Sequence, residues 1–283
     1  MESLAGRVAV VTGAASGMGR SMALRFARSG MDVVLADVEE PALAAAASEV
    51  DATGVRSLAV VADVSDAAAM DHLAEAAFER FGTVHVVCNN AGVGTGGPIW
   101  EMTTQDWEWV LGVNLWGVVH GLRVFVPRLV EQDEGHVVNT ASIAGLTSHA
   151  HMGPYNASKH AVVTISETLW HELRTSGSKV GVTVLCPGLV NTGILDSSRN
   201  RPERLLGRAA REPTPAEEAR WQAIRDLYSA ALSPDAVADM VYDAVLEDRL
   251  YILTDDAFDE AIRTRHEDVQ QRRNPTPKPG LFA

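Results

Sequence analysis

The segment Val8-Ala-Val-Val-Thr12-Gly13-Ala-Ala-Ser16-Gly17-Met18-Gly19 decides the fold of this chain. An apolar run typical of a buried strand ends at Thr12, and a helical pattern begins at Gly17. Glycines between the two let the backbone turn sharply and approach a pyrophosphate, while the helix N-terminus presents free N–H groups to it. The spacing is G-x-x-x-G-x-G rather than the commoner G-x-G-x-x-G. In this context, the glycines predict a nucleotide-binding βα unit.

Asp37 closes the next apolar run and supplies a second feature of a nucleotide site. A carboxylate at this position can accept hydrogen bonds from both ribose hydroxyls of adenosine, and it repels a 2′-phosphate. Ser16 and Val38, which could otherwise supply a compensating cation, are uncharged. The pattern therefore favours NAD over NADP as the cofactor. The alternative is that Asp37 is only the N-cap of the following helix.

The composition indicates one large or two small globular domains, because 46% of the 283 residues are hydrophobic and 22% are charged. The net charge of −13 argues against a nucleic acid or an anionic membrane as partner. The chain shows neither a long apolar run nor a charged-then-apolar leader, so we expect a soluble, cytoplasmic protein. Cys88 and Cys186 lie in apolar strand-like runs, which indicates buried thiols rather than a disulfide.

Short apolar runs alternate with helical stretches, the pattern of a parallel sheet covered on both faces. The predicted strands are 8–12, 33–37, 57–63, 84–89, 136–142, 180–186 and 250–253. The predicted helices are 17–29, 39–51, 66–81, 103–131, 155–176 and 234–247. We therefore expect a single doubly wound α/β domain of the Rossmann type over residues 1–272, with a seven-stranded parallel sheet.

Residues 193–233 differ from this pattern, because several proline-containing breaks surround a charged amphipathic stretch at 216–232. A long insertion after a strand end is where a mobile cover over an active site usually lies, so we expect a substrate-covering segment. The alternative is a surface excursion unrelated to substrate. The Pro-rich tail 273–283 has a composition typical of disorder.

Tyr155-Asn-Ala-Ser-Lys159 places a phenol and an ammonium four residues apart, on one face of a helix that follows Pro154. A free phenol has a pKa of about 10 and is a poor proton-transfer group at neutral pH. An ammonium a few ångströms away favours the phenolate and so lowers this pKa. The pair is therefore a candidate acid/base site, although most such pairs lie on solvated helix faces.

Further motifs follow in chain order over roughly residues 4–192. They are Thr12-Gly-x-x-x-Gly-x-Gly19, Asp63-Val64, Asn89-Asn-Ala-Gly92, Asn114, Ser142, Tyr155-x-x-x-Lys159 and Pro187-Gly188. In this combination the chain resembles the short-chain dehydrogenase/reductase family. The resemblance implies hydride transfer between a nicotinamide cofactor and an alcohol or ketone, with the protein supplying orientation and proton transfer.

The resemblance also implies roles for four residues. Tyr155 would be the general acid/base, and Ser142 would hold the substrate oxygen near the phenol. Lys159 would lower the pKa of Tyr155 and bind the nicotinamide ribose, and Asn114 would steady a water that links Lys159 to solvent. Taken singly, Ser142 could be a plain turn residue and Asn114 a buried structural amide.

The cofactor contacts implied in the same way lie at the ends of the predicted strands. They are Gly13, Ser16, Gly17, Met18, Gly19, Asp37, Asp63, Val64, Asn90, Ala91, Gly92, Tyr155, Lys159, Pro187, Gly188, Val190 and Thr192. Asp63 and Val64 would flank the adenine, and Thr192 would reach the nicotinamide carboxamide.

Apolar residues in the loops near the strand ends predict a lipophilic substrate, either ring-bearing or aliphatic. The expected lining residues are Val93, Pro98, Trp100, Met152, Leu189, Ile194, Leu195, Leu205, Leu206 and Trp221, with His149 and His151 nearby. Trp107, Trp109 and Trp116 fall in helical stretches and are expected to be packing residues. No metal site is predicted, because His149-x-His151 lacks a third ligand. A serine hydrolase is disfavoured because Ser142 is not in a G-x-S-x-G motif.

We predict an NAD-dependent dehydrogenase acting on a lipophilic secondary alcohol and its ketone, as a homodimer or homotetramer. One alternative is an NADPH-dependent ketoreductase, which Asp37 disfavours. A second is a non-catalytic dinucleotide-binding sensor, which would be expected to lack part of the Asn–Ser–Tyr–Lys set. A third is another reaction on the same fold, such as dehydration or epimerisation. Residues 255–272 depart from the usual family ending and leave any C-terminal subunit contact open.

Overall fold

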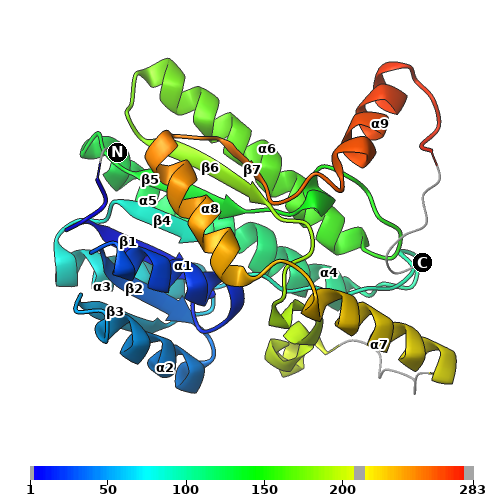
Figure 1. Ribbon diagram of the computed structural model, residues 1–283, viewed down its shortest axis with the longest axis horizontal. Coiled ribbons are helices and arrows are strands. Elements are labelled where there is room, and N and C mark those ends of the chain that lie inside the picture. Colours follow the sequence, from blue (N-terminus) through cyan, green and yellow to red (C-terminus); the bar gives the residue numbers. More distant parts are fainter. Residues whose placement is uncertain (1–2, 207–213, 277–283) are drawn as a thin grey trace.

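A computed structural model describes residues 3–206 and 214–276 of the chain. Its centre is a seven-stranded parallel sheet in the order β3-β2-β1-β4-β5-β6-β7 (Figure 1). The strands are β1 (Val8–Thr12), β2 (Asp32–Asp37), β3 (Ser57–Val61), β4 (Val86–Asn89), β5 (His136–Thr140), β6 (Gly181–Cys186) and β7 (Tyr251–Leu253). The predicted α/β fold with a seven-stranded parallel sheet is confirmed.

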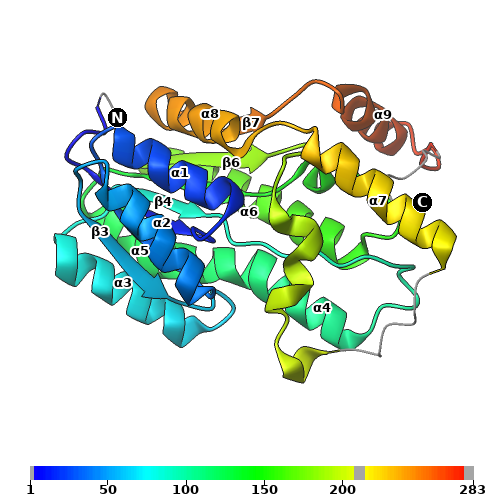
Figure 2. The same cartoon turned by 60° about the horizontal axis from the view of Figure 1, so that its bottom comes forward.

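Helices cover both faces of this sheet (Figures 1 and 2). One face carries α1 (Gly17–Arg28), α2 (Glu40–Asp51) and α8 (Pro234–Glu247), which share a core with Phe26 at its centre. The other carries α3 (Ala67–Phe81), α5 (Gly117–Glu131) and α6 (Gly153–Ser176), which pack around Phe125. Strands β1, β5 and β6 are buried along their whole length, which explains their nearly continuous apolar sequences.

The strand order reverses between β1 and β4. Val10 of β1 pairs with Val34 on one side and with Val87 on the other. The connections that follow β1 and β4 therefore leave in opposite directions and open a crevice at the carboxyl edge of the sheet. Strand β3 ends at Val61 and β5 at Thr140, two residues earlier than predicted, so Asp63 and Ser142 lie in the loops at this edge.

The predicted helix 103–131 is continuous but contains a π-helical turn. It consists of α4 (Thr104–Leu111), the π turn Gly112–Trp116 and α5. Reciprocal hydrogen bonds between Thr103 and Asp106 form a capping box that begins α4. By length and composition alone the segment could cross a membrane. In this fold its apolar residues pack against α3, β4 and α6, which accounts for its composition.

The insertion between β6 and α8 closes on itself. Val190 and Leu232 form an isolated parallel bridge, and the N–H of Asn191 donates to the carbonyl of Leu232 (2.9 Å). Between these ends lie two 3-10 turns, Gly193–Asn200 and Glu203–Leu205, and then helix α7 (Pro215–Ser229). Figures 1 and 2 show this segment beyond the carboxyl ends of the strands.

The C-terminal part of the described chain forms α9 (Asp259–Gln270). Thr276 donates two hydrogen bonds to the Asp268 carboxylate (3.0 Å each) and so ties the following residues to the end of this helix. The predicted tail 273–283 lies mostly outside the described residues. Helix α6 begins at Gly153, two residues before the predicted start, with Pro154 in its first turn.

Candidate active site

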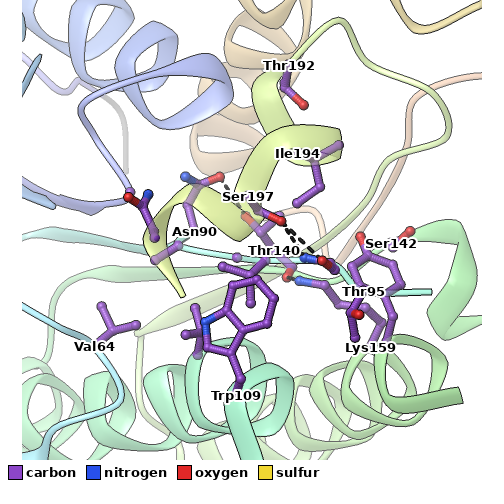
Figure 3. A pocket seen from close by; sticks show the side chains of 18 of the residues that line it. Val64, Asn90, Thr95, Trp109, Thr140, Ser142, Lys159, Thr192, Ile194 and Ser197 are labelled. Atoms are coloured by element: carbon purple, nitrogen blue, oxygen red, sulfur yellow. Dashed lines mark hydrogen bonds between the residues drawn. The ribbon is translucent and has the colours of Figure 1, made fainter. Parts of the chain in front are cut away.

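A pocket with a volume of about 800 Å³ lies at the carboxyl edge of the sheet. The loops after β1, β2, β3, β4, β5 and β6 line it, together with α4, α6 and the insertion. Figure 3 shows Ser142 and Lys159 at one end and Val64 at the other, with Trp109 between them. Every residue predicted to be catalytic or to contact the cofactor lines this pocket except Gly19 and Asn114.

The loop after β1 has the backbone shape that its glycines predicted. Gly13 and Gly17 have φ angles of +66° and +52°, a conformation that favours glycine. A Cβ at Gly19 would overlap the carbonyl oxygen of Gly13, so this glycine lets α1 start directly against the loop. The Ser16 side chain does not cap α1, which leaves the first N–H groups of the helix for an anion.

Thr12 and Asn90 fasten the loops after β1 and β4 to each other. The Thr12 hydroxyl accepts hydrogen bonds from the backbone N–H groups of Asn90 (2.9 Å) and Ala91 (3.1 Å). The Asn90 side-chain amide donates to the carbonyl of Thr12 (3.0 Å). These bonds fix the spacing between the glycine loop and Asn90-Ala91-Gly92 across the crevice.

Asp37 presents its carboxylate to the same pocket. One oxygen accepts from the N–H of Ala15 and the other from the N–H of Glu39, both at 3.0 Å. A carboxylate has about four lone-pair directions, so each oxygen can still accept a second hydrogen bond. The group is therefore held in place and remains able to bind two neighbouring hydroxyls, as the ribose of a dinucleotide requires.

The far end of the pocket is a slot between the loop after β3 and the π turn. Asp63 accepts from the N–H (2.9 Å) and the hydroxyl (2.7 Å) of Ser65, and Val64 lines the slot beside it. The facing wall was not predicted: it consists of Leu111, Gly112, Val113, Trp116 and His120. Trp116 therefore lines the pocket rather than serving only in packing.

The acid/base candidates meet at the other end. Tyr155 and Lys159 lie in the first turns of α6, and the Ser142 hydroxyl lies beside the phenol of Tyr155 in the same pocket. Ser142 also accepts from the N–H of Ala144 (3.1 Å), which fixes its loop. Lys159 is only 3% exposed, and its Nζ donates to the carbonyl of Thr140 (2.8 Å).

Burial dominates the protonation of these two side chains. It raises the pKa of Tyr155 above its ordinary value, and the hydrogen bond with Ser142 opposes this rise. It lowers the pKa of Lys159 to about 8. The net shift of the Tyr155 pKa is therefore upward, opposite to the predicted direction, because burial of the phenol is the largest contribution. Lys159 Nζ donates to Thr140 and lies 5.6 Å from the centre of the phenol ring.

Asn114 lies in the π turn, fully buried behind the pocket. Its side chain accepts from the N–H of Val93 (2.8 Å) and donates to the carbonyl of Val93 (2.9 Å) and to the Ser158 hydroxyl (3.2 Å). These bonds tie the loop after β4 to the helix that carries Tyr155 and Lys159. The role predicted for Asn114, steadying a water that links Lys159 to solvent, stays a prediction.

A family model described as short chain dehydrogenase matches residues 7–203 of the chain. The chain belongs to the short-chain dehydrogenase family. The Streptomyces arenae protein 1-deoxy-11-beta-hydroxypentalenate dehydrogenase is 38% identical over 96% of this short-chain dehydrogenase and 90% of its own length. The C alpha-dehydrogenase of a Sphingobium species is 32% identical over 89% and 82% of the two chains.

The fold of this short-chain dehydrogenase also matches solved structures of the family. A short-chain dehydrogenase/reductase from Burkholderia phymatum, solved in complex with NAD, is 48% identical and superposes with a TM-score of 0.94. The match covers 99% of this chain and all of the other. The chain is therefore an oxidoreductase-family protein with a Rossmann-type nucleotide site.

In this short-chain dehydrogenase, the residues that follow β7 pack against the Pro187-Gly188 turn. The N–H of Gly188 donates to the hydroxyl of Thr254 (3.0 Å), which follows β7. A Cβ at Gly188 would collide with the Asp255 carboxylate and lie 3.0 Å from the ring of Phe258. Glycine is thus required for the C-terminal segment to pack closely enough for Phe258 to reach the pocket.

The substrate end contains many of the predicted lining residues. Val93, His149, Met152, Leu189, Ile194, Leu195, Leu205 and Trp221 line the pocket. Trp100 and Leu206 do not, and they are 82% and 60% exposed. Pro98 and His151 are likewise absent from the lining; they are the chain neighbours of Gly97 and Met152, which form an isolated bridge.

Other lining residues were missed. Trp109, expected only to pack, is buried with Val93, Val110 and Leu205 and also lines the pocket. Tyr228 on α7 and Phe258 come from segments that carried no motif, so only the tertiary fold shows them. Among the described residues, no three His, Cys, Asp or Glu side chains gather as a metal site.

The insertion is fastened over the pocket by two buried contacts. The Ser197 hydroxyl accepts from the N–H of Gly94 (3.0 Å) and donates to its carbonyl (3.2 Å). Arg201 pairs with Asp106 (2.7 Å) while its guanidinium lies 5.1 Å from the centre of the Trp109 ring. The predicted covering segment thus forms one wall of the pocket.

Proposed function

We propose that this protein transfers a hydride between NAD(H) and a lipophilic secondary alcohol or its ketone. The observation that carries the proposal is that the Ser142 and Tyr155 side chains line the same end of the pocket, with the Lys159 ammonium buried close by. Two hydroxyl groups that converge at one end of a nucleotide-sized cleft are suited to hold and protonate a single substrate oxygen.

The residues along the cleft fit a dinucleotide. The glycine loop and the uncapped start of α1 suit a pyrophosphate, and Asp37 suits a ribose with a free 2′-hydroxyl. A 2′-phosphate would be repelled by the Asp37 carboxylate, which favours NAD. The 48% identical relative from Burkholderia phymatum was solved with NAD, which supports the same choice.

The bound nicotinamide would supply or accept the hydride. Tyr155 would donate its phenolic proton to the substrate oxygen during ketone reduction and take the proton back during alcohol oxidation. Ser142 would donate a hydrogen bond to the same oxygen and so fix its distance from the phenol. Lys159, a cation at neutral pH with a pKa of about 8, would stabilise the phenolate once cofactor and substrate are in place.

The substrate class follows from the pocket wall beyond Ser142. Met152, Leu189, Ile194 and Trp221 are apolar, and few charged side chains lie at this end. Such a wall favours a lipophilic molecule bearing one reacting hydroxyl or carbonyl. The related dehydrogenase of 1-deoxy-11-beta-hydroxypentalenate is named for a hydroxylated substrate, which agrees with this proposal.

A binding titration followed by one substitution tests the proposal. Purified protein is titrated with NADH and with NADPH while nicotinamide fluorescence is measured, and tighter binding of NADH is expected. Tyr155→Phe should retain NADH binding and lose activity by about 10²- to 10⁴-fold. Tyr242→Phe is the matched control, because this ring stacks on Arg25 outside the pocket. Retained activity in Tyr155→Phe would remove the assigned acid/base role.

A further inference from the structure

Two side chains of the insertion contact Glu39, which lies two residues after Asp37. Arg199 donates from Nε to Glu39 Oε1 (2.9 Å), and its Nη2 lies 2.7 Å from the same oxygen. Asn200 donates to that oxygen as well (2.6 Å). Glu39 lies 160 positions before Arg199 in the sequence, and all three residues line the pocket.

This contact spans the adenosine half of the groove. On one side, the N–H of Glu39 donates to Asp37 (3.0 Å), so Glu39 sits beside the carboxylate proposed to hold the ribose. On the other, Arg199 Nη1 donates to the carbonyls of Gly193 (3.3 Å) and Asp196 (3.1 Å). Gly193 follows Thr192, whose side chain packs against the phosphate loop. A Cβ added at Gly17 would lie 3.2 Å from Thr192 Cγ2. The contact therefore connects the ribose carboxylate with the phosphate loop.

We propose that Glu39, Arg199 and Asn200 form a latch that closes the insertion over the adenosine half of NAD(H), so that the dinucleotide leaves only when the latch opens. The latch rests on the proposed NAD binding, and it adds a separate function to the insertion. The same segment that shapes the substrate wall through Ile194 would control how long the cofactor stays bound.

The strength of the contact suits repeated opening. The side chains of Arg199 and Glu39 are 41% and 29% exposed, so solvent weakens their ion pair. The hydrogen bond from Asn200 and the ion pair both lower the pKa of Glu39, which keeps the carboxylate charged at neutral pH. By contrast, the Arg201–Asp106 contact is buried and would hold the rest of the insertion while the latch moves.

The experiment measures how fast NADH is released. Protein loaded with NADH is mixed in a stopped-flow instrument with a large excess of NAD, and the loss of bound-nicotinamide fluorescence is recorded. Glu39→Gln and Arg199→Met are each expected to release NADH about 3- to 5-fold faster than the wild type. The double variant should be no faster than the faster single variant, because both substitutions open the same contact.

Arg225→Met is the matched control. Arg225 belongs to the same insertion and makes an exposed ion pair with Asp196 (3.8 Å) that does not line the pocket. Its release rate should equal that of the wild type, and thermal unfolding without cofactor should be similar in all variants. Release rates of Glu39→Gln and Arg199→Met within twofold of the wild type would overturn the latch. Failure of the wild type to bind NADH would instead overturn the proposed function.

Discussion

Gly121→Ala probes the buried polar chain that joins the elements of the site. Asn89 at the end of β4 donates to Asn139 of β5 (2.9 Å), and Asn139 donates to Ser166 of α6 (3.0 Å). A Cβ at Gly121 in α5 would overlap Asn89 Oδ1 and lie 2.7 Å from its Cγ. The alanine variant must therefore rotate Asn89 away from Asn139 or shift α5.

The expected cost follows from these contacts. Breaking the buried hydrogen bond costs about 1–3 kcal/mol, because Asn139 loses its partner. Overpacking costs a further ~1–3 kcal/mol, and the better helix propensity of alanine returns about 1 kcal/mol. We expect a net loss of about 3 kcal/mol in the free energy of unfolding, and a fall of roughly 6–12 °C in the melting temperature.

A double-mutant cycle in urea, followed by circular dichroism, separates this mechanism from a general effect on α5. In the Asn89→Ala background the obstructing amide is absent, so the Gly121→Ala step should be close to neutral or slightly stabilising. An equal cost of the Gly121→Ala step in both backgrounds would refute the reasoning, as would a Gly121→Ala variant as stable as the wild type.

Three further predictions concern the cofactor and pH. Asp37→Ala should weaken NADH binding and reduce the discrimination against NADPH, and an unchanged ratio of the two dissociation constants would contradict the assigned role of this carboxylate. The kcat/KM of alcohol oxidation should rise with pH while that of ketone reduction falls, because the raised pKa of Tyr155 makes the phenolate scarce at neutral pH; two flat profiles would argue against Tyr155 as the proton-transfer group. Burial lowers the pKa of His136 to about 3, so the folded state stays neutral while the unfolded state binds a proton below its pKa of about 6.5. Its contribution to stability is therefore complete above pH 6.5 and is lost as the pH falls toward 3, by about 2 kcal/mol at pH 5. Urea unfolding at pH 7 and pH 5 should show a smaller loss in His136→Gln than in the wild type.

Much of the fold could be predicted because the sheet is covered on both faces. Strands such as 180–186 are almost uninterrupted in apolar residues, and the intervening helices have clear apolar periodicity. The π turn at Gly112–Trp116 could not be predicted, because one extra residue within a helix leaves the surrounding pattern intact. That turn nevertheless carries Asn114 and one wall of the slot beside Val64.

The candidate site divides in the same way. Gly13, Asp37, Tyr155 and Lys159 follow short local motifs at strand ends, and the structure brings them to one pocket. The Glu39–Arg199 contact has no local signal, because its partners are brought together only by the path of the insertion. The pKa of Tyr155 was also predicted in the wrong direction, since the depth of burial and the direction of the Lys159 ammonium are tertiary properties.

The pairing of Val190 with Leu232 makes the insertion an exchangeable module. Because the segment begins and ends at one point, its length and sequence can vary while β6 and α8 keep their positions. A chimera that receives this segment from another family member would retain the Ser142–Tyr155–Lys159 chemistry and acquire a different substrate wall. It would also exchange Arg199. The substrate preference and the time for which the cofactor stays bound would therefore change together.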